Sequence, residues 1–203
     1  NPNASRARHV HDPELDPLWA TIEELGVPVG FHPTGHSSLR DDLARRYLDT
    51  PNGGVSGVAG RNRVELMMAF GSLAAGGVLE RHPSLRCAFL EGTCGYLPWW
   101  LWRLDEAWEK FGPGSEVQIS QLPSQYFFRQ CYIATDGDEE PLRHVIEAIG
   151  DDSIVVSTDY PHSDGLFPTA IEEFTHLEGV SDKSKTKILW DNCARLYNLG
   201  AGA

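Results

Sequence analysis

The sequence lacks most of the features that mark membrane, secreted and nucleic-acid-binding proteins. Its 17 Lys and Arg residues are outnumbered by 29 Asp and Glu residues, which gives a formal net charge of −12, whereas nucleic acid and anionic membranes require a basic surface. No apolar run approaches the roughly 18–20 residues that cross a bilayer. The 4 cysteines form no Cys-x-x-Cys pair and are too sparse for a secreted disulfide scaffold. These absences predict a cytoplasmic protein with neither nucleic acid nor a membrane as its partner.

The N-terminus also lacks an initiator Met and the apolar core of a signal peptide, a start typical of a trimmed or excerpted chain. The composition is otherwise ordinary for a globular protein, with 41% hydrophobic and 23% charged residues. A chain of 203 residues can bury a substantial core, so we expect a single domain over residues 1–203.

Short apolar runs alternate with segments of helical periodicity along the chain. The runs predict four strands, at residues 27–32, 85–91, 130–136 and 153–159. Helical patterns are predicted from 12 to 26, from 61 to 81, from Pro98, from Asp138 with acids and a Pro in its first turn, after Pro168 and from Ser181. Strands that each lead into a helix indicate an α/β fold with a parallel sheet.

Two further segments carry specific expectations. The stretch from 33 to 60 is rich in Gly, Ser and Pro and is longer than ordinary connections, which is typical of a loop that shapes a binding pocket. The helix after Pro98 carries four Trp residues at a spacing that predicts burial rather than a ligand platform: Trp99, Trp100, Trp102 and Trp108.

The four predicted strands end in side chains that can bind a metal or move protons: His32, Glu91, Asp136 and Asp159. In parallel α/β folds functional groups gather at these carboxyl ends. His32 is a metal ligand or a hydrogen-bonded core histidine. Asp159 closes a buried run, where a carboxylate is costly unless paired or metal-bound, although it could also cap a helix. Glu91 is a general acid or base, the partner of a ligating His, or a helix cap, while Asp136 fits plain turn chemistry.

A His-x-His pair, His9 and His11, has the spacing that places two imidazoles on one side of a strand. No apolar strand precedes it, and it runs directly into the start of a helix. An ordinary surface segment is therefore the favoured interpretation of this pair.

Three ordered motifs give the chain a family resemblance. They lie at residues 79–105, at 157–162 (STDYPH) and at 187–197 (KILWDNCARLY). Together they resemble the amidohydrolase-related family of TIM-barrel, metal-dependent hydrolases and decarboxylases similar to aminocarboxymuconate-semialdehyde decarboxylase. The resemblance extends from about 12 to 199. It implies a (β/α)8 barrel of which this chain holds strands five to eight, so that the chain corresponds to the C-terminal part and strands one to four lie upstream.

The resemblance also implies roles for particular residues. His32 matches the metal-binding His that ends the fifth barrel strand, and Asp159 matches the aspartate of the eighth, which binds the metal or activates its water. His36 and His162 are the candidates for substrate contact. Glu91 stands where the family decarboxylases carry a catalytic His, and Glu91 or Asp159 would move the proton. The remaining metal ligands, a His-x-His after the first strand, would lie upstream.

These implications leave several functions open. The first is a hydrolase in which water activated by a divalent metal, Zn²⁺ before Mn or Fe, attacks an ester, lactone or amide; Glu91 in place of His favours it. The second is non-oxidative decarboxylation of an unsaturated or aromatic carboxylic acid. Two further possibilities are a catalytically silent binding or dimerisation module, and an open α/β module that uses His9, His11 and His32 as a new site. We expect a small-molecule substrate and, because half a barrel leaves open sheet edges, a homodimer.

Overall fold

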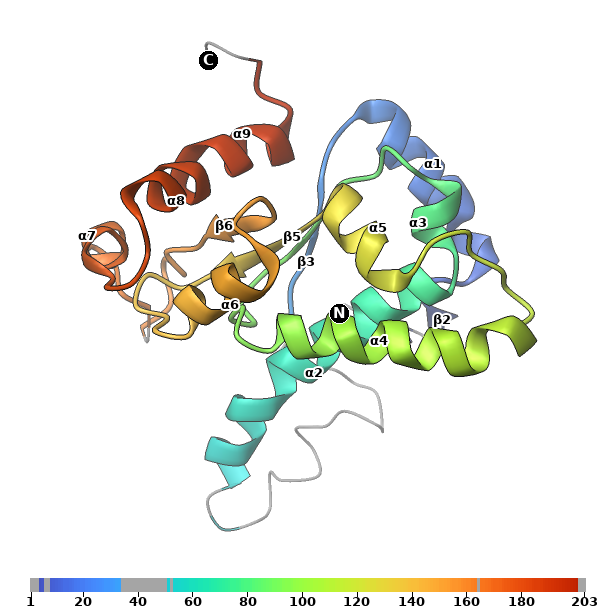
Figure 1. Cartoon of the computed structure of the whole chain (residues 1–203), viewed down its shortest axis with the longest axis horizontal. Coiled ribbons are helices and arrows are strands. Elements are labelled where there is room, and N and C mark those ends of the chain that lie inside the picture. The colour runs from blue at the N-terminus through green and yellow to red at the C-terminus, as the bar shows by residue number, and fades with distance from the viewer. Residues whose placement is uncertain (1–3, 6–7, 34–50, 52, 164, 201–203) are drawn as a thin grey trace.

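A four-stranded parallel sheet forms the centre of the computed structural model, which describes residues 4–5, 8–33, 51, 53–163 and 165–200 (Figure 1). The strands are β3 (Val29–Phe31), β4 (Cys87–Phe89), β5 (Cys131–Thr135) and β6 (Ile154–Val156), hydrogen-bonded in that order. In the register, Val29 lies opposite Cys87 and Cys87 opposite Cys131. All four predicted strands are therefore confirmed, and so is the α/β class with a parallel sheet.

Helices connect the strands, as expected of parallel neighbours, which cannot be joined by tight turns. They are η1 (Pro13–Leu15), α1 (Asp16–Leu25), α2 (Gly53–Ala75), α3 (Val78–Arg81), α4 (Leu97–Phe111), η3 (Gly112–Gly114), α5 (Pro123–Gln130), α6 (Leu142–Ile149), α7 (Ala170–His176), α8 (Asp182–Thr186), the π-helical η4 (Lys187–Asp191) and α9 (Asn192–Tyr197). A two-residue ribbon, β1 (Ala4–Ser5) with β2 (Arg8–His9), precedes them. In Figure 1, α1 and α9 lie on opposite sides of the view. Within the described ranges no helix is both long and apolar enough to cross a membrane.

The helix predicted over 61–81 starts earlier than expected and is interrupted before its end at Arg81. Helix α2 begins at Gly53, so the end of the segment predicted as a long loop is helical, and residues 34–50 and 52 of that segment lie outside the described part. The helical pattern also breaks between α2 and α3, where Gly77 adopts φ +76°. A Cβ on Gly76 would lie 2.3 Å from the Cβ of His11. The break therefore occurs where the N-terminal segment packs against the backbone.

Two other expectations fail because tertiary contacts outweigh local preference. Helix α6 begins at Leu142 with no acid in its first turn, so the predicted acidic start at Asp138 is wrong. In α4, Trp99 and Trp102 are 55% and 58% exposed, whereas Trp100 donates a 2.9 Å hydrogen bond from Nε1 to the Met67 carbonyl. The four Trp residues are therefore not all buried.

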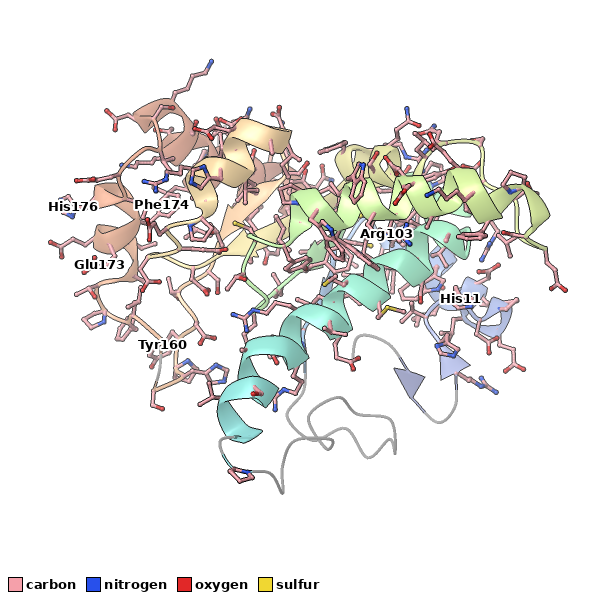
Figure 2. The ribbon with its side chains drawn as sticks, turned by 60° about the horizontal axis from the view of Figure 1, so that its bottom comes forward. His11, Arg103, Tyr160, Glu173, Phe174 and His176 are labelled. Atoms are coloured by element: carbon pink, nitrogen blue, oxygen red, sulfur yellow. The ribbon has the colours of Figure 1, made fainter. Side chains whose placement is uncertain are left out.

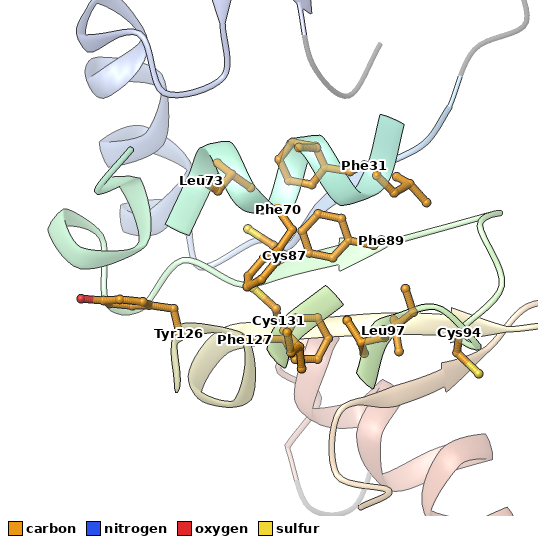
Figure 3. Close-up of a cluster of buried hydrophobic side chains, with 14 of the residues drawn as sticks. Phe31, Phe70, Leu73, Cys87, Phe89, Cys94, Leu97, Tyr126, Phe127 and Cys131 are labelled. Atoms are coloured by element: carbon orange, nitrogen blue, oxygen red, sulfur yellow. The ribbon is translucent and has the colours of Figure 1, made fainter. Parts of the chain in front are cut away.

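The core lies between the sheet and helices α2, α4 and α5 (Figure 3). Phe89 is 1% exposed, and its ring stacks on Phe31 at a centroid distance of 5.3 Å and meets Phe70 edge-on at 5.8 Å. Because side chains alternate across a strand, small residues such as Ala88 and Ala134 face the other way and pack with Leu196 of α9. One face of the sheet thus carries the aromatic cluster, and the other packs against α9.

We predict that Phe89→Ala lowers the free energy of unfolding by about 3–5 kcal/mol, because it opens a cavity at the centre of the aromatic cluster. The matched control is Phe111→Ala on α4, where the ring is 70% exposed and the change should stay within about 0.5 kcal/mol. Urea unfolding of the two variants measures the difference. Equal losses would show that the aromatic cluster is not the centre of the core.

Candidate active site at the carboxyl end of the sheet

Acidic side chains that follow three neighbouring strands line one cavity of about 190 Å³. Its wall includes Glu91 after β4, Asp136 after β5, and Ser157 and Asp159 after β6, together with Asn62 and Arg63 of α2. The sequence places these groups together because parallel strands end at one edge of the sheet. Figure 2 shows Tyr160, on the loop after β6, on the same side of the molecule as the first turns of α2.

Two of these acids have strained backbones. Glu91 has φ +59° and Asp159 has φ +54°, and Thr93 in the same loop as Glu91 has φ +56°. The left-handed conformation costs a residue with a side chain about 1 kcal/mol or more, and it persists only where surrounding contacts enforce it. Such strain concentrates at functional sites. The strained backbone therefore indicates a functional site after β4 and β6, and it does so independently of which residue types are present.

The Glu91 carboxylate joins β3, β4 and α2. Its Oε2 forms an ion pair with Nε2 of His32, a side chain that is 51% exposed. Asn62 donates from Nδ2 to both the Glu91 carbonyl, at 3.2 Å, and Oε1, at 3.1 Å. The other ring nitrogen of His32, Nδ1, lies 2.6 Å from the Pro33 carbonyl. Glu91 is therefore placed as the acceptor at the centre of a polar chain.

A second carboxylate–imidazole pair adjoins the first. His162 Nδ1 lies 2.8 Å from Asp159 Oδ1, and one ligand atom from each of Glu91, Asp159 and His162 lies within 4.8 Å of the other two. The structure thus brings together three of the predicted site residues and links His32 to the first of them. His36 lies outside the described residues.

The His9 and His11 rings stack at a centroid distance of 5.4 Å. Within the described ranges they belong to no group of three or more potential metal ligands. The alternative site built from His9, His11 and His32 therefore gains no support.

Asp136, which the sequence assigned to plain turn chemistry, lies in the cavity wall. Burial is the largest cause that raises the pKa of its carboxyl. Together with the neighbouring carboxylates of Glu139, Asp159 and Asp138, and against the lowering effect of Arg63, it brings this pKa to about 6. Its position at a strand end was the signal for including it in the site.

Glu139 holds the two acidic loops together from inside the protein, a role the sequence did not reveal. Its side chain is buried, and Oε1 accepts hydrogen bonds from the Cys94 and Gly95 backbone N–H groups at 2.8 and 2.9 Å. Oε2 accepts a third bond, of 3.0 Å, from the Thr135 hydroxyl. No local pattern could have indicated contacts that span 45 residues. The loops after β4 and β5 are consequently fixed relative to one another.

Comparison with known proteins shows the family to which the chain belongs. Residues 1–199 match the amidohydrolase family, Amidohydro_2, and the chain belongs to it. It is 28% identical over 194 residues to gamma-resorcylate decarboxylase of Rhizobium sp. (strain MTP-10005), covering 92% of the chain and 55% of that protein. It is 25% identical over 193 residues to 2-amino-3-carboxymuconate-6-semialdehyde decarboxylase of Dictyostelium discoideum, covering 95% and 50%. The chain thus spans about half the length of these curated relatives.

Solved structures show the same similarity. A dihydroxybenzoic acid decarboxylase from Polaromonas sp. JS666, with bound manganese and 2-nitroresorcinol, superposes with a TM-score of 0.72 at 25% identity, over 98% of this chain and 58% of that one. A 5-carboxyvanillate decarboxylase from Sphingomonas paucimobilis reaches a TM-score of 0.79 at 24% identity, over 97% and 56%. The latter likeness concerns the fold alone.

We predict that Glu139→Ala destabilises the chain by about 2–4 kcal/mol, because it leaves the buried Cys94 N–H and Thr135 hydroxyl without their acceptor. Glu139→Gln keeps one acceptor oxygen and should lose about half as much. The control is Glu140→Gln, whose side chain is 79% exposed and whose loss should be within about 0.5 kcal/mol. The free energies of unfolding are measured in urea. Equal losses in the Glu139 variants and in Glu140→Gln would contradict this role of Glu139.

We predict that Asp136→Asn stabilises the metal-free chain above pH 6 and not below pH 4. The folded pKa, about 6, lies above the ordinary value of 3.8, so the folded state binds the proton more tightly and stability falls as pH rises between these values. Asn removes that penalty, which we put at about 1–2 kcal/mol after allowing for the partial exposure of Asp136. Thermal unfolding in chelator at pH 4 and pH 8 measures the difference. A gain of equal size at both pH values would show that charge is not its cause.

Proposed function

We propose that this protein catalyses the metal-dependent, non-oxidative decarboxylation of an aromatic or unsaturated carboxylic acid. In this proposal β3 to β6 correspond to strands five to eight of a (β/α)8 barrel. The observation that carries the proposal is the convergence of His32, Glu91, Asp159 and His162 at the carboxyl end of the sheet. The names of the curated relatives cited here, each of them a decarboxylase, give the reaction its direction.

The donor atoms present fit a divalent metal ion. Metal–ligand bonds of roughly 2.0–2.3 Å allow ligand atoms to lie up to about 4.5 Å apart. Asp159 has potential ligand atoms of Glu91 and His162 at close to that spacing, and His32 lies next to this group through its contact with Glu91. Carboxylate and imidazole donors suit Mn²⁺ as well as Zn²⁺ or Fe²⁺. The manganese in the Polaromonas enzyme makes Mn²⁺ our first candidate in place of the Zn²⁺ expected from the sequence. When bound, the ion would act as a Lewis acid toward the substrate's oxygen atoms.

We assign Asp159 and His32 as the ligands that this chain supplies. Asp159 follows β6 and lines the cavity. Both ring nitrogens of His32 face oxygen atoms, Nε2 toward Glu91 and Nδ1 toward Pro33. His32 can therefore bind an ion through Nε2 only after Nε2 gives up its contact with Glu91. The Glu91 carboxyl would then be available for proton transfer.

The chain's own groups then divide the work of the reaction. Decarboxylation breaks the bond between a carbon atom and the carboxylate, releases CO₂ and requires a proton at that carbon. Glu91 is the proposed proton donor, because its carboxyl lies in the cavity wall. Once His32 binds the ion, the Glu91 carboxyl would give its proton to that carbon and regain one from solvent. His162, held by Asp159, is the proposed substrate contact. Arg63 adds positive charge to a wall that also holds four acids, and it offsets part of their repulsion of an anionic substrate.

Hydrolysis of an ester, lactone or amide is the second candidate. It is favoured by one observation, the presence of Glu91 rather than a His after β4, because a carboxylate beside a metal-bound water is a suitable base. The two reactions are distinguished by their products, CO₂ or a new acid.

We predict that Glu91→Gln and Asp159→Asn separate proton transfer from metal binding. Glu91→Gln should keep its manganese and lose turnover by about 10²–10⁴-fold. Asp159→Asn should lose turnover and weaken manganese binding by at least about tenfold, because a charged donor is removed. CO₂ release from dihydroxybenzoates and elemental analysis after dialysis measure the two effects.

The control for this pair is Asp182→Asn in α8, an exposed carboxylate that should leave both quantities unchanged. Normal CO₂ release by Glu91→Gln would contradict the assigned role of Glu91. Ester or lactone cleavage without CO₂ release would establish the second candidate instead.

A further inference from the structure

We propose that Asn62 is a positioning residue that fixes the Glu91 carboxylate against His32. Asn62 lies on α2, 29 residues before Glu91 in the chain, and its side chain is only 8% exposed. The proposal rests on the proposed function only in giving Glu91 and His32 roles in the reaction. The contact itself is a feature of the structure.

One amide group restrains Glu91 in two ways. The bond from Asn62 Nδ2 to the Glu91 carbonyl acts on the backbone, which has φ +59°. The bond from the same nitrogen to Oε1 acts on the side chain and leaves Oε2 facing His32. The strained backbone and the direction of the carboxylate are therefore enforced by the same donor.

The orientation of the Asn62 amide is itself determined by its neighbours. Its Oδ1 accepts a 3.1 Å hydrogen bond from Nε of Arg61. An amide oxygen cannot donate, so the Arg61 bond leaves Nδ2 as the atom that faces Glu91. An Asp at this position would present an acceptor to a carboxylate, and a Leu of similar size would present nothing.

Close packing brings α2 and the Glu91 loop together at this point. Leu66 lies one helical turn after Asn62, and a Cβ on Gly92 would lie 2.3 Å from Leu66 Cδ1. A side chain at position 92 would require Leu66, which is fully buried, to move. Because Glu139 holds the far end of the same loop at Cys94, the loop is fixed at both ends, and Asn62 is the contact at the end that carries Glu91.

The test follows the His32 imidazole by ¹⁵N NMR in the metal-free, full 203-residue chain, with its signals assigned by their loss in His32→Gln. We expect Asn62→Leu and Glu91→Gln to move the His32 Nε2 signal in the same direction, since both weaken its contact with Oε2. Asn62→Gln, which keeps an amide donor, should stay closer to the native chain. His144, 66% exposed on α6, should not move and serves as the internal reference.

A matched control removes a comparable buried amide elsewhere. Asn192 is fully buried, and its Nδ2 donates to the carbonyls of Asp151 and Ile154. Asn192→Leu should lower stability in urea without moving the His32 signal. Should Asn62→Leu not fold, Asn62→Ala provides the same test, because it removes the donor without adding a charge.

Kinetics provide the second measurement. Loss of a residue that orients a reacting group reduces rate by about 10–100-fold, so we expect kcat of Asn62→Leu to fall by this factor with KM within about twofold. An unchanged His32 signal in Asn62→Leu and Asn62→Ala would overturn the inference, whatever their stability. Failure of the proposed function would appear differently, as full activity in Glu91→Gln.

Discussion

The buried carboxylate of Glu139 is the interaction on which the geometry of the site depends. It accepts hydrogen bonds from backbone N–H groups of the loop after β4 and from a hydroxyl at the end of β5. A carboxylate removed from water is costly in free energy unless such donors surround it. With these donors in place the connection is rigid, because a loop that moved away would leave the carboxylate and its own N–H groups without hydrogen-bond partners. The relative positions of Glu91 and Asp136 follow from this connection.

With the loop fixed at that end, strain at the other end can be maintained. Left-handed backbone at Glu91 and Asp159 opposes folding by about 1 kcal/mol or more for each residue. The aromatic core of Phe31, Phe70 and Phe89 offsets this strain by stabilising the sheet. Burial of a single such side chain contributes about 2–3 kcal/mol. The stability of the core therefore exceeds the strain at the strand ends, which is the usual relation between a scaffold and a reactive site.

The sequence predicts this architecture because apolar periodicity, from which the strands and helices are predicted, is a local property of the chain. Apolar runs define β3 to β6, and parallel pairing then requires His32, Glu91 and Asp159 to meet at one edge of the sheet. The structure shows this in two contacts. His32 lies against Glu91, and Glu91 and Asp159 form a group with His162. The residues that hold these groups were not predictable, because they act across long sequence separations. Asn62 reads as an ordinary helix residue. Glu139 reads as an acid in the first turn of a helix, since hydrogen bonds to distant backbone groups leave no trace in local pattern.

The distribution of charge around the cavity connects stability with function. Glu91, Asp136 and Asp159 share a small wall with Arg63. The pKa of Asp136 rises as a result of burial and of the carboxylates of Glu139, Asp159 and Asp138. Stability alone would not favour such a concentration of acids, because each adds repulsion that the fold must offset. A bound divalent cation would reverse the sign of the interaction, converting repulsion among carboxylates into coordination and lowering the pKa of Asp136. Protons and metal ions would therefore compete for the same acids, so the feature that destabilises the metal-free chain is also the one that would make it bind a cation.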